Sequence, residues 1–89
     1  GKIPALVDGS LHVFESVAIL IYLAEKTGKF LPPTGQGRYA TLQWCLFQAA
    51  GLGPMFGQFG HFTVFAKEKV PYAIERYTNE SLRILGVLD

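Results

Sequence analysis

Two short segments of the chain combine residue types that could hold a small charged ligand. They are Lys2-Ile3-Pro4 and, further along, Glu15-Ser16. A proline at a strand start has no N–H for the ladder, and if its peptide bond is cis, the backbone groups of Ile3 are turned outward. At a helix start, the amide and hydroxyl of Ser16 suit a carboxylate, and Glu15 suits an ammonium group. Together these groups would fit the α-amino acid end of a ligand.

The same residues also have a purely structural interpretation. Pro4 could simply begin a strand, and Glu15 and Ser16 could do no more than cap a helix. Their spacing alone does not decide between binding and structure.

A β-hairpin is the predicted element between these two segments. Apolar runs at 3–7 and 11–14 flank Asp8-Gly9, a dipeptide typical of a type I′ turn. Because a hairpin of two strands is marginal in water, we expect further strands upstream.

An apolar helix is predicted directly after the hairpin. It begins at Glu15-Ser16 with Ser16 as its cap, ends near Thr27, and has Gly28 just beyond its end. Its apolar residues lie on every side, so we expect both of its faces to be buried.

The second half of the chain is predicted to be helical. Its expected parts are a Pro- and Gly-rich linker at 32–37, a helix at 38–50, an interruption at 51–54, a kinked and partly helical stretch at 55–66, and a helix from Pro71 to the end. The predicted buried stripe of the last helix is Val70, Ile74, Tyr77, Ser81, Leu85 and Leu88.

Composition and charge argue against several classes of function. Eight Lys and Arg against seven Asp and Glu give a net charge of +1, with no basic face for a nucleic acid. The longest apolar run, 17–24, is far shorter than the roughly 20 residues that cross a bilayer. One cysteine, Cys45, and two histidines offer neither an internal disulfide nor a metal-ligand spacing. We therefore expect a cytoplasmic protein with no metal, membrane or nucleic acid, in which Cys45 packs as a small hydrophobe.

Both ends of the chain look cut. The sequence begins at Gly1 without a methionine, and the last helical pattern has no stop signal before Asp89. We expect a fragment.

Several motifs resemble the cytosolic glutathione transferases, over nearly the whole chain. Those that resemble the glutathione-binding half are KIPALVD at 2–8, FESVAI at 14–19 and YLAEKTG at 22–28. Those that narrow the likeness to the nu class, with its disulfide-bond reductases and the fungal nitrogen-regulator prion, are TLQW at 41–44, GLGPM at 51–55 and PYAIERY at 71–77.

The fold implied by this resemblance is an α+β fragment. Residues 1–31 would be the last hairpin and helix of a thioredoxin-like domain, 32–37 a linker, and 38–89 the first helices of an all-helical domain.

The resemblance also implies roles for single residues. Pro4 would be the family's cis proline, and Ile3 would pair through its backbone with the cysteinyl unit of glutathione. Glu15 and Ser16 would hold the γ-glutamyl end. Lys2 would lie beside the glycyl carboxylate, and the guanidinium of Arg76 would approach the same ligand. The group that contacts the glutathione sulfur lies upstream in the family, so no catalytic residue is assigned.

The implied activity is that of a glutathione transferase or a glutathione-dependent disulfide-bond oxidoreductase. Such a protein would use glutathione as co-substrate, act on an electrophile or a disulfide, and form a homodimer. The alternative is a non-catalytic regulatory or scaffold module with the same domains. We expect the isolated chain to be inactive.

Overall fold

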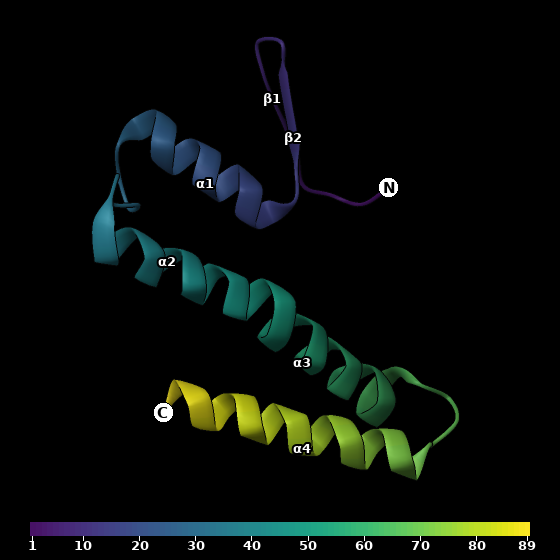
Figure 1. Cartoon of the computed structure of the whole chain (residues 1–89). Helices are drawn as coiled ribbons and strands as arrows, with labels where there is room; N and C mark the ends of the chain where they lie inside the picture. The colour runs from purple at the N-terminus through teal and green to yellow at the C-terminus, as the bar shows by residue number, and fades with distance from the viewer. The chain divides into compact units, whose positions relative to one another are not determined.

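The computed structural model describes all 89 residues, and they divide into two compact units, Gly1–Cys45 and Leu46–Asp89. Each unit is described by itself. Figure 1 shows the elements in chain order. They are β1 (Ala5–Asp8), β2 (Leu11–Phe14), α1 (Ser16–Thr27), α2 (Gly35–Phe47), the π-helical turn η1 (Gln48–Leu52), α3 (Gly53–Gly60), the π-helical turn η2 (His61–Phe65) and α4 (Pro71–Leu88). The predicted order of a hairpin followed by helices is confirmed.

The hairpin pairs β1 with β2 in antiparallel register, from Ala5 opposite Phe14 to Asp8 opposite Leu11. The predicted turn type is wrong. Asp8 belongs to the strand, and the turn consists of Gly9 and Ser10, of which only Gly9 has a positive φ, at 62°. Type I′ needs positive φ at both positions, whereas glycine at the first is the pattern of type II′.

Helix α1 ends as its sequence predicts. The N–H of Gly28, in the left-handed region, donates to the carbonyl of Ala24 at 2.8 Å and so closes the helix. The expected burial of both faces is wrong for these 89 residues: no α1 residue is buried, and Leu20 is 62% exposed. The hairpin packs on one side of the helix, and α2 faces another side across an open groove lined by Leu20 and Leu42.

The segment between α1 and α2 is anchored by Leu31, the one buried residue of the first unit. Helix α2 begins at Gly35 rather than at 38, so part of the predicted linker is helical. Glycine in a helix costs only about 1 kcal/mol relative to alanine and does not forbid it. The Arg38 side chain holds this region, with Nη1 3.5 Å from the Pro32 carbonyl and Nη2 3.6 Å from Oε1 of Glu25. The domain boundary at 32–37 stays a prediction.

The second unit contains π-helical turns where the sequence predicts interruptions. Pro54 lies in the first turn of α3 and has no N–H for the carbonyl four residues back. Before it, the Gly53 N–H donates to the carbonyl of Gln48, the i to i−5 bond of a π turn. A Cβ on Gly53 would lie 3.2 Å from that oxygen, a tight contact that a larger residue could make only with a small shift of the turn. The predicted stretch 55–66 is helical to Gly60 and π-helical to Phe65.

Helix α4 packs along α3, as Figure 1 shows, and supplies the core of the second unit. Its most buried side chain is Ile84, 1% exposed, followed by Ser81 at 8%. The predicted stripe is therefore right at Ser81 and wrong at both ends. Val70 precedes the helix and is 37% exposed, and Leu85 and Leu88, 47% and 48% exposed, stand in place of Ile84. The ring of Tyr77 stacks on that of Phe62 with centroids 5.6 Å apart.

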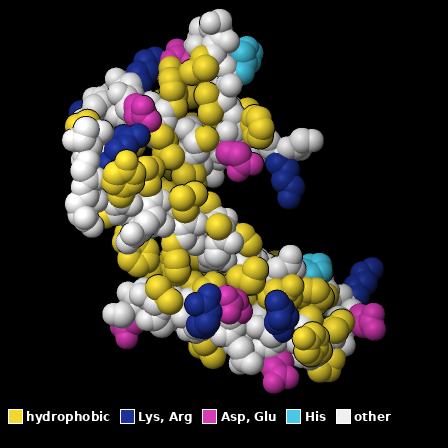
Figure 2. Space-filling view, viewed as in Figure 1, with side chains coloured by type: hydrophobic (Ala, Val, Ile, Leu, Met, Phe, Trp, Pro, Cys, Tyr) yellow, Lys and Arg dark blue, Asp and Glu magenta, His cyan; other side chains and the backbone are white.

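Much apolar surface stays uncovered in both units. Hydrophobic side chains reach the surface along much of the face shown in Figure 2, and large ones such as Phe14 and Phe65 are 74% and 77% exposed. No helix has both the length and the apolar character to cross a membrane.

Candidate functional site

The register of the hairpin brings the two predicted binding segments to one end of it. Ala5 lies opposite Phe14, so Ile3-Pro4 enters the hairpin where Glu15-Ser16 leaves it. Lys2 precedes Ile3 directly and therefore belongs to the same end. Of the predicted site residues, only Arg76 lies elsewhere, on α4 of the second unit.

The Ile3-Pro4 peptide bond is cis, as predicted, and lies just before β1. The Ile3 side chain is 93% exposed, and none of the backbone hydrogen bonds outside the helices and strands involves Ile3. The backbone N–H and C=O of this residue are therefore open to a ligand.

Glu15 is the single residue that joins β2 to α1, and its backbone is unusual. Its φ is 75° and its ψ is 118°, outside the regions that residues other than glycine normally occupy. Such a conformation costs on the order of 1–3 kcal/mol, and residues held this way gather at functional sites. The strain is not evident from the sequence, because glutamate has no preference for positive φ.

Ser16 is the first residue of α1 and not its cap, so that prediction is wrong. The N-cap is Glu15, and no side chain caps the helix. The reason is that the chain turns into the helix at Glu15, one position earlier than predicted. The Ser16 hydroxyl is consequently exposed and takes no part in capping.

The first turn of α1 presents unpaired amides beside that hydroxyl. The first bond of the helix runs from the Ile19 N–H to the Glu15 carbonyl at 3.0 Å, which leaves the N–H groups of Ser16, Val17 and Ala18 without an acceptor in the helix. No acidic residue lies in this turn. Open amides at the positive end of a helix dipole suit a carboxylate.

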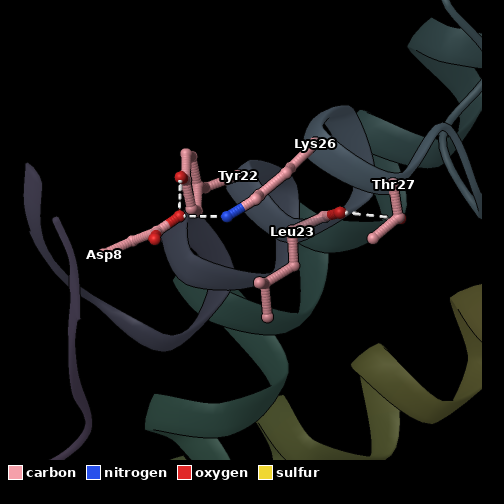
Figure 3. A network of polar contacts seen from close by, with 5 residues as sticks. All are labelled: Asp8, Tyr22, Leu23, Lys26 and Thr27. Atoms are coloured by element: carbon pink, nitrogen blue, oxygen red, sulfur yellow. Dashed lines mark hydrogen bonds and ion pairs between the residues drawn. The ribbon is translucent and has the colours of Figure 1, made fainter.

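The opposite end of the hairpin is tied to α1 by a polar cluster. Figure 3 shows the Tyr22 hydroxyl and the Lys26 ammonium both pointing at Asp8, and both donate to its Oδ2. Hydrogen bonds from Lys26 and then Tyr22 hold the pKa of Asp8 below its usual value. The same bonds to Asp8 raise the pKa of Lys26 and that of Tyr22. We call these three residues the Asp8 cluster; sequence analysis did not find it.

Arg76 lines an open cleft of about 630 Å³ between α3 and α4. In that cleft Arg83 donates to both carboxylate oxygens of Glu80, at 2.9 and 2.7 Å. The Arg83 hydrogen bonds lower the pKa of Glu80, and the charge of Arg76 adds to the effect. Arg76 makes no ion pair of its own and is exposed.

Cys45 is half-buried and lines an apolar groove of about 520 Å³ in the first unit, together with Leu20 and Leu42. These surroundings agree with the expected packing role.

Three comparisons with known proteins bear on this arrangement. Residues 1–25 match the family model described as "Glutathione S-transferase, N-terminal domain". The chain is 54% identical over 95 aligned positions to the disulfide-bond oxidoreductase YfcG of Escherichia coli, across 99% of this chain and 44% of that protein.

Solved structures give the same result. A glutathione transferase family member from Pseudomonas fluorescens, crystallised with two glutathione molecules, has a TM-score of 0.91 and 49% identity over 98% of this chain and 42% of its own. The nitrogen regulation fragment of the yeast prion protein Ure2p has a TM-score of 0.81 and 36% identity over 98% of this chain and 42% of its own.

The chain is therefore related in sequence and in fold to the glutathione transferases. Within them, its relatives include disulfide-bond oxidoreductases and Ure2p, so the resemblance found in the sequence is confirmed. The chain spans less than half the length of each relative described above.

Proposed function

We propose that this chain supplies the γ-glutamyl-binding part of the glutathione site in a glutathione transferase or a glutathione-dependent disulfide-bond oxidoreductase. The observation that carries the proposal is the junction at Glu15. There a strained backbone begins α1 with open amides and a free hydroxyl, at the same end of the hairpin as the unpaired backbone of Ile3. Related structures contain bound glutathione or its oxidised form, which supports the choice of ligand.

Each group in the site has a chemical task in this proposal. Ser16 donates its amide and hydroxyl to the γ-glutamyl carboxylate, and Glu15 pairs with the neighbouring ammonium group. The backbone N–H and C=O of Ile3 pair with the cysteinyl unit, which fixes the direction in which the thiol points. Lys2 pairs with the glycyl carboxylate, and the assignment of Arg76, in the second unit, stays a prediction.

Bound glutathione supplies the thiol, and a thiol of pKa about 8.5 is mostly protonated at neutral pH. The protein must therefore stabilise the thiolate, and in the family that donor comes from outside the region matched by these residues. We infer that the 89-residue chain binds and orients glutathione but does not activate it, and that it is inactive alone.

The second substrate is an electrophile or a disulfide, and the 54% identity to a disulfide-bond oxidoreductase favours the disulfide. We also propose that the protein is cytoplasmic. We further propose that it forms a homodimer, because large apolar side chains of both units are exposed and a second subunit would bury part of this surface.

A second candidate is a non-catalytic regulatory module. The observation that favours it is the 36% identity to the nitrogen regulation fragment of Ure2p. A glutathione-disulfide exchange assay on the longest natural form of the protein separates the two: turnover supports the enzyme, and binding without turnover supports the module.

The test of the binding site is Ser16→Ala in the longest natural form. We expect the free energy of glutathione binding to weaken by about 1–3 kcal/mol, because a charged carboxylate loses a hydrogen bond. Ser10→Ala is the matched control, since Ser10 is an exposed serine at the other end of the hairpin. Isothermal titration calorimetry gives both values, and an unchanged Kd for Ser16→Ala contradicts the assignment.

A further inference from the structure

We propose that Asp8, Tyr22 and Lys26, the Asp8 cluster, are positioning residues for the glutathione site. By fixing the angle between the hairpin and α1, they set where Ser16 lies relative to Ile3. This inference rests on the proposed function.

The connection between hairpin and helix is a hinge of one residue. β2 ends at Phe14 and α1 begins at Ser16, so Glu15 alone links them. Ile3 adjoins the strand pair of Ala5 with Phe14 and moves with the hairpin, whereas Ser16 moves with the helix. Any rotation about the Glu15 backbone therefore changes the distance between the two groups that hold the ligand.

The Asp8 cluster is the second point of attachment, far from that hinge. Asp8 lies at the turn end of β1, opposite Leu11, and both Tyr22 and Lys26 come from later turns of α1. Lys26 is about 15 Å along the helix from Ser16 at a rise of about 1.5 Å per residue. Because these bonds to Asp8 lie so far along α1 from Glu15, they strongly restrict rotation of the helix relative to the hairpin.

Apolar packing of α1 on the hairpin is limited in the first unit. No residue of α1 is buried, and Val17 and Ile19 are half-buried. The two bonds to Asp8 are the only hydrogen bonds between side chains of the hairpin and of α1 (Figure 3). Apolar contact is non-directional, whereas two donors on one carboxylate oxygen define a direction.

The Asp8 cluster contributes little to the free energy of unfolding, so its effect on ligand binding can be measured apart from an effect on stability. The Lys26 and Asp8 side chains are 54% and 37% exposed, and exposed ion pairs contribute little to folding. The cluster is therefore expected to act on ligand geometry much more than on the unfolding midpoint.

The experiment is Asp8→Asn and, separately, Tyr22→Phe in the longest natural form, with Kd measured for glutathione and for cysteinylglycine. Cysteinylglycine lacks the γ-glutamyl end that Ser16 and Glu15 would hold. We expect each variant to weaken glutathione binding about 3- to 10-fold and to leave the Kd of cysteinylglycine unchanged. Equal weakening for both ligands, or no weakening for glutathione, overturns the proposal.

Glu25→Gln is the matched control. Glu25 is also a carboxylate of α1, but its ion pair is with Arg38 and not with the hairpin, so its removal should leave both Kd values unchanged. In the double variant Asp8→Asn with Ser16→Ala, the Asp8 change should weaken binding less than it does alone, because the hydroxyl that it positions is gone while the amides of α1 remain. Additive effects contradict the inference.

The same series distinguishes the inference from the function on which it rests. If Ser16→Ala weakens glutathione binding and Asp8→Asn does not, only the positioning role fails. If neither variant weakens it, the proposed γ-glutamyl site fails with it.

Discussion

The two units of the chain are held by different forces. In the first, Leu31 alone is buried, and directed polar contacts at Asp8 and Arg38 join the elements. In the second, Ile84 and Ser81 lie in a core between helices, and the Glu80–Arg83 pair lies on the outside. The open backbone groups that suit a ligand occur in the first unit. The difference indicates that the second unit is a packed frame, whereas the first is joined by polar contacts and leaves backbone groups open at the proposed site.

The largest expected effect is on the core of the second unit. Ile84→Ala should lower the free energy of unfolding by about 2–5 kcal/mol, since it removes a buried side chain and leaves a cavity. Leu82→Ala, on the same helix but 62% exposed, should change it by no more than about 0.5 kcal/mol. Urea denaturation of the longest natural form measures both, and equal losses would show that α4 does not carry the core.

A smaller effect is expected at the Glu15 hinge, where the backbone of the proposed site is strained. Glu15→Gly should raise the free energy of unfolding by up to about 1 kcal/mol, because glycine accepts the positive φ. It should also weaken glutathione binding. Glu15→Gln keeps the strain and loses only the charge, so it should weaken binding with no gain in stability. Thermal melts and calorimetry on the pair check this, and a Gly variant that melts below the Gln variant would refute it.

The smallest effect is the pH dependence of the Asp8 cluster. The pKa of Asp8 is lowered by its bonds in the folded state, so the contribution of Asp8 is present above the usual value of 3.8 and is lost as pH falls through the lowered pKa. The difference in glutathione affinity between wild type and Asp8→Asn should therefore be constant near neutral pH and vanish in acid. Titrations across this range test the point; a difference that persists below the lowered pKa would exclude the charge of Asp8 as its cause.

Much of the fold could be predicted from local patterns. The alternation of 11–14, the glycine after Thr27 and the proline at 71 place β2 and the ends of two helices correctly. Helix boundaries near 35 and 52 were missed, because glycine and proline only weaken a helix there and a π turn accommodates Pro54. Ile84 was missed because the positions three and four residues after Ser81 lie on nearly the same side of a helix with 3.6 residues per turn, so the pattern alone does not choose between Ile84 and Leu85.

The candidate site was only partly predictable. The residue types at 3–4 and 15–16 could be recognised in the sequence as candidates for binding, and the hairpin register explains why they lie at the same end of the hairpin. The backbone strain at Glu15 and the contacts of the Asp8 cluster could not be predicted from the sequence. Tyr22 and Lys26 have the spacing of neighbours on one helix face, but only the three-dimensional packing determines that this face meets Asp8.

The most direct test of the central claim is an NMR titration of the ¹⁵N-labelled longest natural form with glutathione, with cysteinylglycine as the comparison ligand. The account predicts that the backbone amide resonances of Ser16, Val17 and Ala18 shift with glutathione and not with cysteinylglycine, while that of Ile3 shifts with both. If the three α1 amides do not respond to glutathione, or respond equally to both ligands, the γ-glutamyl end does not bind at this helix terminus and the account is wrong.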